Sequence, residues 1–160
     1  MRRFLAPTLV AVFLLSASLS AVAAGAPTRS SSQAVVKAAY NKSLKATILV
    51  NGSGLTLYLL TSDPKGTATC AALDPRCPST WPALATTGAP KAGPGVKGSL
   101  LGTTKGAHGV TQVTYNGHPL YTFHGGSGAG PGDKKPGDEN GEAFFYIWYA
   151  VSPKGNAIHK

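Results

Sequence analysis

Short apolar runs separated by turn-forming residues divide this chain into segments typical of β-strands. Residues 46–50 and 55–60 are two such runs, and Asn51-Gly52-Ser53-Gly54 lies between them. Asn-Gly pairs tolerate the positive φ angles that tight hairpin turns require. Along residues 55–60 both faces are apolar, which is typical of a central strand. The pattern therefore predicts a β-hairpin over residues 46–60 whose second strand is buried on both sides.

The same pattern returns later in the chain. Residues 110–115, Asn116-Gly117 and residues 118–123 form a matching hairpin, in which Pro119 suits a strand start or an edge position. Each copy then reaches a tryptophan. The chain therefore contains two pseudo-repeats, at about residues 46–84 and 110–151. Alignment of the two copies matches Tyr58 with Tyr121, Leu60 with Phe123, and Trp81 with Trp148, and we expect these residues in the core. Each phenol is expected to reach a polar partner.

The remaining segments complete a mainly β fold. The alanine content of residues 34–40 would allow a helix, but their paired valines and the turn that follows favour a strand. Residues 85–109 and 125–141 are rich in glycine and other turn residues, so we expect long loops there. The aromatic run at residues 143–151 predicts a terminal strand. No long helical periodicity is visible, so we expect one small β-rich domain.

The N-terminal residues have the features of an export signal. Arg2 and Arg3 precede an apolar stretch that ends in small residues, so residues 1–24 are interpreted as a cleaved signal peptide. Residues 25–33 then form a flexible lead-in, and residues 34–160 form the domain. No cysteine stands directly after the predicted cleavage site, so we expect no lipid anchor. The expected location is secreted or periplasmic, at the cell envelope, with no membrane span after cleavage.

Cys70 and Cys77 are the only two cysteines. Export places them in an oxidising compartment, where a disulfide between them would close a short ring. The alternative is a redox-active pair, but such pairs commonly have two intervening residues at a helix N-terminus. Here six residues intervene, so the spacing favours a structural bridge.

Charge narrows the classes of partner. Without the signal peptide the chain has 13 basic and 6 acidic residues, a net charge of +7. The basic residues are scattered, and no basic run has interleaved aromatic residues, which argues against nucleic-acid binding. A cationic surface that adheres weakly to anionic envelope polymers is the preferred interpretation.

The order of motifs resembles a bacterial family of secreted repeats and predicted lipoproteins with a Tyr-x-aromatic-x-x-Asp motif. The residues that carry the resemblance are Leu57–Asp63, the two cysteines with Trp81-Pro82-Ala83-Leu84, Gly109–Tyr121, Gly137–Glu142 and Trp148–Val151. The resemblance implies export, a compact β-rich repeat and residence in the envelope. It brings no established activity.

Three positions depart from the family pattern. Leu60 replaces the usual aromatic residue after Tyr58, and Gly126 stands where the second copy would have its motif Asp, the counterpart of Asp63. The lipid-anchor cysteine common in the family is absent. These departures argue against a function that rests on two matching Asp sites.

The sequence offers one candidate metal site and no catalytic motif. His124 could form a metal site with Asp133, Asp138 or Glu142 if the loop folds back, although solvated polar side chains are the simpler interpretation. No cofactor is otherwise predicted. No Gly-x-Ser-x-Gly elbow is present and neither cysteine is expected to be free, so catalysis is not expected.

The sequence therefore predicts an exported binding or structural module of the envelope, with an envelope polymer or a protein as partner. An accessory that handles a metal ion or electrons is the alternative, and a hydrolase comes third. Outward-facing aromatic side chains such as Tyr146 or Tyr149 could provide a platform for a glycan or a protein.

Overall fold

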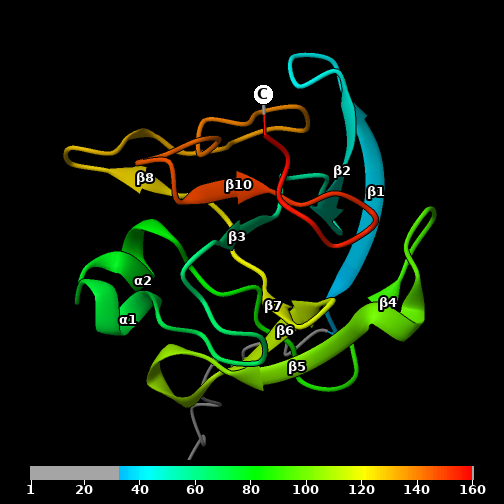
Figure 1. Cartoon of the computed structure of the whole chain (residues 1–160), viewed down its shortest axis with the longest axis horizontal. Coiled ribbons are helices and arrows are strands. Elements are labelled where there is room, and N and C mark those ends of the chain that lie inside the picture. The colour runs from blue at the N-terminus through cyan, green and yellow to red at the C-terminus, as the bar shows by residue number, and fades with distance from the viewer. Residues whose placement is uncertain (1–32, 160) are drawn as a thin grey trace, which may run out of the picture. The chain divides into compact units, whose positions relative to one another are not determined.

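A computed structural model of the protein describes residues 33–159 (Figure 1). The predicted signal peptide and most of the lead-in lie outside these residues. The strands are β1 Val35–Asn41, β2 Ala46–Asn51, β3 Tyr58–Leu60, β4 Lys91–Ala92, β5 Leu101–Lys105, β6 Thr111–Tyr115, β7 His118–Pro119, β8 Gly125–Gly126, β9 Gly130–Pro131 and β10 Trp148–Ala150. The helical turns are α1 Cys70–Leu73, α2 Cys77–Thr80, η1 Gly98–Leu100 and η2 Ala107–Gly109.

The strands form small sheets, which confirms the predicted mainly β fold. The strand orders are β2-β1-β4, β10-β3, β5-β6-β7 and β8-β9. All pairs are antiparallel except β1 with β4. The predicted strand at residues 34–40 is confirmed as β1, which pairs with β2 along its length. The predicted disulfide between Cys70 and Cys77 is also present.

The two halves of the domain follow the same path. In the first half β1 pairs with β2, and in the second half β5 pairs with β6. After each Asn-Gly turn the chain returns along the preceding strand for a few residues: Leu57 N–H donates to Leu49 O, and Leu120 N–H donates to Val113 O. The sequence repeat is therefore a structural repeat that includes one further strand at the start of each half.

The halves meet at Tyr58 and Tyr121. The backbone of each tyrosine donates to the carbonyl of the other, both at 2.9 Å. Ala150 of the second half pairs with Tyr58, and Ala83 of the first half pairs with Tyr121. The end of each half thus crosses over to pair with the tyrosine segment of the other half. This arrangement is a pseudo-twofold exchange between the repeats.

Two buried clusters lie on opposite faces of β3. Tyr58 and Leu60 belong to one cluster, together with both tryptophans, while Leu57 and Leu59 belong to the other. All four side chains are buried. The alternation predicted for this run is therefore confirmed. Its two faces pack into two different hydrophobic clusters, one on each side of the strand.

Four predicted segments need correction. The hairpin at residues 46–60 is short, because β3 leaves β2 and pairs with β10 instead. Residues 85–109 and 125–141 are not simply loops, since the first segment contains β4 and β5 and the second contains β8 and β9. Only residues 148–150 of the predicted terminal strand are extended in a sheet, because Ala143, Phe145 and Tyr146 adopt positive φ angles that break the strand.

The two Asn-Gly turns differ in conformation. Asn116 and Gly117 have φ angles of 51° and 84°, as a two-residue primed hairpin turn requires. In the first turn only Gly54 has a positive φ, and the side chain of Asn51 accepts bonds from Ser53 N–H and Leu55 N–H. The same dipeptide therefore closes a tight turn in one half and a longer loop in the other.

Candidate functional site

Two buried tyrosine–aspartate pairs link the halves. Tyr58 donates its hydroxyl to Asp133 Oδ2 at 2.7 Å, and Tyr121 donates its hydroxyl to Asp63 Oδ2 at 2.7 Å. Burial raises the pKa of both phenols, and the neighbouring carboxylates add to the effect. The predicted polar partner of each phenol is therefore present, and each partner comes from the opposite half.

Asp133 is the structural counterpart of Asp63, so the assignment of Gly126 to the motif position was wrong. Asp63 N–H donates to Leu60 O, and Asp133 N–H donates to Phe123 O. In each half the accepting carbonyl belongs to the second residue after the tyrosine. The second oxygen of each carboxylate accepts a backbone bond a few residues further on, from Thr69 N–H or from Asn140 N–H. The second Asp is retained, but it lies seven residues later in the sequence.

The intervening residues form an inserted hairpin, residues 126–132. β8 pairs with β9 at its neck, with Gly125 opposite Pro131. A Cβ on Gly125 would lie 2.2 Å from Gly130 O, and a Cβ on Gly132 would lie 2.2 Å from the carbonyl carbon of His124. Glycine is required at the neck because the two strands of backbone approach too closely for a side chain.

One known protein family matches the second half of the chain. Residues 102–152 match the family described as a secreted repeat of unknown function. The predicted resemblance is confirmed for this part of the chain. No curated protein and no solved structure matches the chain. The matched secreted repeat covers the second half from β5 to just beyond β10, including the inserted hairpin.

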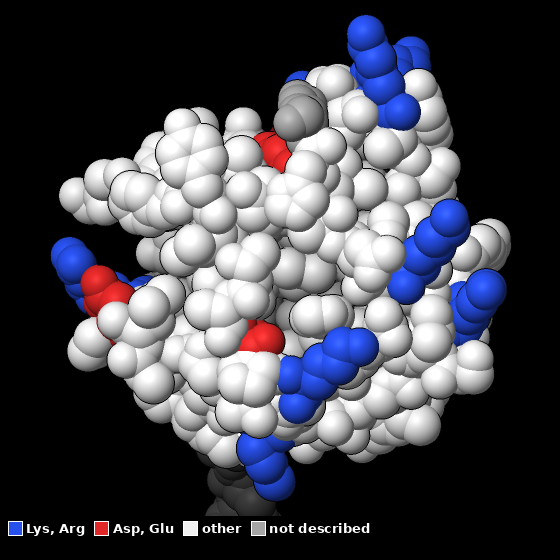
Figure 2. Space-filling view, in the orientation of Figure 1, with Lys and Arg blue, Asp and Glu red and all other residues white. Residues whose placement is uncertain are grey.

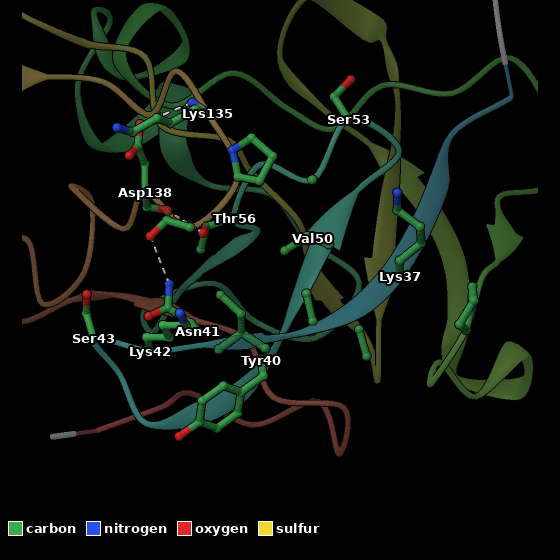
Figure 3. Close-up of a pocket in the computed structure, with 17 residues that line it drawn as sticks. Lys37, Tyr40, Asn41, Lys42, Ser43, Val50, Ser53, Thr56, Lys135 and Asp138 are labelled. Carbon is green, nitrogen blue, oxygen red and sulfur yellow. Dashed lines mark hydrogen bonds between the residues drawn. The ribbon is translucent and has the colours of Figure 1, made fainter.

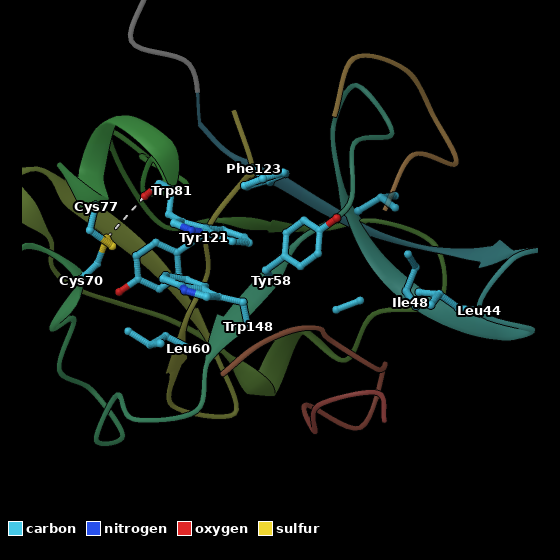
Figure 4. Packing of buried hydrophobic residues seen from close by; sticks show 12 residues of the cluster. Leu44, Ile48, Tyr58, Leu60, Cys70, Cys77, Trp81, Tyr121, Phe123 and Trp148 are labelled. Atoms are coloured by element: carbon cyan, nitrogen blue, oxygen red, sulfur yellow. Dashed lines mark hydrogen bonds between the residues drawn. A yellow bond between two sulfur atoms is a disulfide. The ribbon is translucent and has the colours of Figure 1, made fainter. Parts of the chain in front are cut away.

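The tryptophans of the two copies stack on each other at the centre of one cluster (Figure 4). The rings of Trp81 and Trp148 are 4.0 Å apart and inclined by only 2°. Trp81 also contacts the rings of Tyr58 and Phe123, and Trp148 meets Tyr121 edge to face. Both tryptophans are buried. The motif residues predicted as core therefore form one aromatic layer at the junction of the halves.

A groove of about 720 Å³ lies between β1–β2 and the loop at residues 135–138 (Figure 3). Ile48 and Val50 contribute its apolar floor. Tyr40 is 64% exposed, but it alternates along β1 with Lys37 and Ala39, the partners of Val50 and Ile48, so its ring lies on the other face of β1–β2. The cationic side chains of the lining are those of Lys37, Lys42 and Lys135. The groove therefore combines an apolar surface with three ammonium groups.

The loop that forms one wall of the groove is tied to the sheet by its own polar groups. Asn41 Nδ2 donates to Gly137 O and to Glu139 Oε2, and Thr56 Oγ1 donates to Asp138 O. Asp138 Oδ2 accepts the backbone N–H groups of residues 134 and 135. These bonds lower the pKa of Asp138. The acidic groups of the wall are thus used within the fold.

The same holds for acidic residues elsewhere in the described part. Asp63 and Asp133 are bound to tyrosines, and Glu142 accepts a bond from Ala150 N–H. The only salt bridge among residues 33–159 joins Arg76 to Asp74. The ten lysines of these residues therefore have no salt-bridge partner within the described chain, and Figure 2 shows basic side chains projecting while acidic atoms are mostly recessed.

A second, aromatic hollow of about 330 Å³ lies beside the disulfide lobe, residues 70–80. The lobe contributes one side, and residues 127–129 of the inserted hairpin contribute another. Residues 144, 145, 147 and 148 complete the lining. Tyr146, next to this segment, is 84% exposed, as the sequence suggested for an outward-facing aromatic residue.

The predicted metal ligands are not gathered into one cluster. No group of three or more His, Cys, Asp or Glu side chains suited to a metal ion occurs among residues 33–159. His124 is exposed, whereas Asp133 is buried against Tyr58 and Asp138 caps its own loop. A metal function for these residues remains a prediction. Within the same residues no helix has the length and apolarity to cross a bilayer.

Sequence reasoning missed the groove and the residues around it. Lys37 and Lys42 come from β1 and the turn after it, while Lys135 is almost a hundred residues further on. Charge counting found only scattered lysines. Two signals could have helped: the predicted strand at residues 34–40, and the polar residues Asn41 and Thr56 beside apolar strand positions.

Proposed function

We propose that this protein is an exported module of the cell envelope that binds an anionic polysaccharide in the groove between β1–β2 and residues 135–138. The signal-like N-terminus and the secreted family of the second repeat support export. The groove supports binding, because its volume lies within the range of about 300–1,000 Å³ for ligand sites.

One observation carries the choice of an anionic ligand. Three lysines line the groove, and its one acidic side chain, Asp138, accepts two backbone bonds from its own loop. The ionised Asp138 offsets one of the three lysines, so the groove lining keeps a net charge of +2, which would attract carboxylate or phosphate groups. Lys37 also donates to Gly52 O, so its ammonium group is held at the groove.

The apolar part of the groove supports a polysaccharide rather than a simple ion. The exposed side chains of Ala39 and Pro136 add apolar lining to the floor formed by Ile48 and Val50, and this apolar surface would contact the C–H face of a sugar. In Figure 3, Lys37 and Lys135 lie on opposite sides of Val50, where they would meet charged groups on successive sugar units.

Calorimetric titration with tetragalacturonate tests the proposal, with its methyl ester as the uncharged control of the same ring structure. We expect saturable binding of the acid and at least about 10-fold weaker binding of the ester. Salt should weaken binding of the acid without abolishing it, because the apolar floor contributes independently of charge. Equal binding of acid and ester would contradict the proposal.

Two double variants separate the groove from general charge. Lys42→Ala with Lys135→Ala removes two groove lysines, and Lys105→Ala with Lys154→Ala removes two exposed lysines outside the groove lining. Both carry the same net charge. We expect the first to weaken binding by about 10-fold or more and the second by less than about 3-fold. Equal losses would show that binding depends only on net charge.

A further inference from the structure

The aromatic hollow beside the disulfide lobe is built from the parts in which the two repeats differ. The lobe with its disulfide occurs only in the first half, and the inserted hairpin occurs only in the second. In Figure 1, α1, α2 and β8 lie on the same side of the domain. The hollow between them is therefore not a by-product of the pseudo-twofold arrangement.

The segment that completes the hollow is strained. Ala143, Phe145 and Tyr146 have φ angles of 56°, 49° and 58°, a region that costs residues other than glycine about 1–3 kcal/mol each. Burial does not offset this cost, because Phe145 is 74% exposed. Strained backbone that displays aromatic rings to solvent is typical of binding sites.

The chemistry of the lining specifies an uncharged ligand with an apolar face. Phe144, Phe145 and Leu73 offer apolar surface, and the two stacked, mostly buried tryptophans also belong to the lining. The charged groups in the lining, Asp74 and Arg76, are paired with each other at 3.1 Å. The lining therefore has no net charge to attract a charged ligand. Adjacent hydroxyl groups of a ligand could instead form hydrogen bonds with the carboxylate of Asp74 and the guanidinium of Arg76.

We propose that the hollow is a second binding site, for a neutral sugar residue of a glycan. Its volume of about 330 Å³ suits a small ligand of one or two rings rather than a long apolar chain. Thr80 and Ser127 also belong to the lining, and their hydroxyl groups are of the kind that sugar hydroxyls need as partners. The site differs in residues and in charge from the groove, and it does not depend on the proposed function.

The tryptophans provide a direct test, because the chain has only two and both line the hollow. Titration with tri-N-acetylglucosamine should give a saturable change in tryptophan fluorescence. The groove contains no tryptophan, so binding there is reported by calorimetry and not by this signal. No saturable change with tri-N-acetylglucosamine or with maltotriose would overturn the proposal, and the groove would be unaffected by that result.

The first repeat, which lacks the inserted hairpin, suggests a deletion variant that should still fold. Deletion of residues 126–132 restores in the second half the spacing that the first half has between Tyr58 and Asp63. The ends of the deleted segment already meet, since the position of a Cβ on Gly132 lies 2.2 Å from the backbone of His124. We expect this variant to keep its near-ultraviolet circular dichroism while it loses the fluorescence response to the sugar.

Phe145→Ala is the second variant, because this exposed side chain can be removed without leaving a cavity. It should weaken sugar binding by about 10-fold or more, as expected for an aromatic side chain central to a contact. Tyr40→Ala removes an exposed aromatic side chain outside the hollow and should leave this response unchanged. Unchanged affinity in the deletion variant and in Phe145→Ala would refute the site. Tighter binding of an apolar peptide than of either sugar would refute the proposed ligand.

Discussion

The crossed tyrosine–aspartate pairs should contribute to stability to a similar extent, because each joins a buried phenol to a buried aspartate. Asp63 and Asp133 are both 5% exposed, and both bonds are 2.7 Å long. Tyr58→Phe and Tyr121→Phe each remove one hydroxyl group and leave a buried carboxylate oxygen without that donor, and Tyr58→Phe also removes an acceptor of Gly141 N–H.

The expected loss follows from the charge of the acceptor. A hydrogen bond to a charged group contributes about 1.5–3 kcal/mol, compared with about 0.5–1.5 kcal/mol between neutral groups. At about 4 °C per kcal/mol for a domain of this size, each variant should lower the melting temperature by about 6–12 °C. The unfolding free energy is measured by urea denaturation and the melting temperature by calorimetry.

Tyr115→Phe is the matched control. Tyr115 is equally buried, but its hydroxyl donates to the neutral carbonyl of Pro153 at 2.9 Å and accepts from Lys97 N–H. We expect a loss of about 1 kcal/mol, the value for neutral partners. If Tyr58→Phe and Tyr121→Phe cost no more than this control, the carboxylates do not hold the halves together as described.

Three further predictions concern other parts of the fold. Replacement of Cys70 and Cys77 by serine should reduce the unfolding free energy by about 2.5 kcal/mol, because the short ring no longer restricts the unfolded chain; urea denaturation with and without reductant checks this. Gly141→Ala should destabilise the aromatic layer, since its Cβ would lie 2.6 Å from the ring of Trp81; a lowered melting temperature and altered near-ultraviolet circular dichroism are expected, and an unchanged melting temperature would contradict the close packing. The pKa of Asp138 in the folded protein is below its ordinary value of 3.8, so the stability that its carboxylate adds to the groove wall is present above pH 3.8 and is lost as the pH falls through the lower folded pKa. The amide N–H of Lys135 donates to this carboxylate, so its NMR chemical shift should titrate below pH 3.8. The variant Asp138→Asn should lack this transition.

Local pattern was sufficient for the parts of the fold that depend on neighbouring residues. The alternation along residues 55–60, the tight turn at Asn116-Gly117 and the short ring between the cysteines all follow from adjacent positions. The polar partners of Tyr58 and Tyr121 were also expected, because a buried phenol needs one. Their identity was not, since each partner belongs to the opposite half.

Pairing between the halves is where sequence reasoning failed. β3 pairs with β10 and not along β2, a choice that depends on contacts 90 residues apart. The second Asp was assigned to Gly126 because a fixed spacing cannot allow for an insertion that closes on itself. The strand expected at residues 143–151 is interrupted by three positive φ angles at residues other than glycine, and no local sequence signal indicates them.

The candidate sites were predictable only in part. The sequence indicated outward-facing aromatic residues such as Tyr146, which is 84% exposed and follows Phe145 of the hollow lining in the chain. The groove was not predicted, because its lysines are brought together only when the loop at residues 135–138 packs against β1–β2. That packing rests on Asn41 and Thr56, two polar side chains that bind backbone carbonyls of the loop.

NMR mapping of tetragalacturonate binding tests the central claim most directly. The protein is titrated with the acid, and amide shifts are followed for every described residue. We expect the largest shifts along β1, near Ser53 and in the loop at residues 135–138, with little change at Lys105 and Lys154. Shifts spread evenly over all exposed lysines would contradict a groove that binds an anionic polysaccharide.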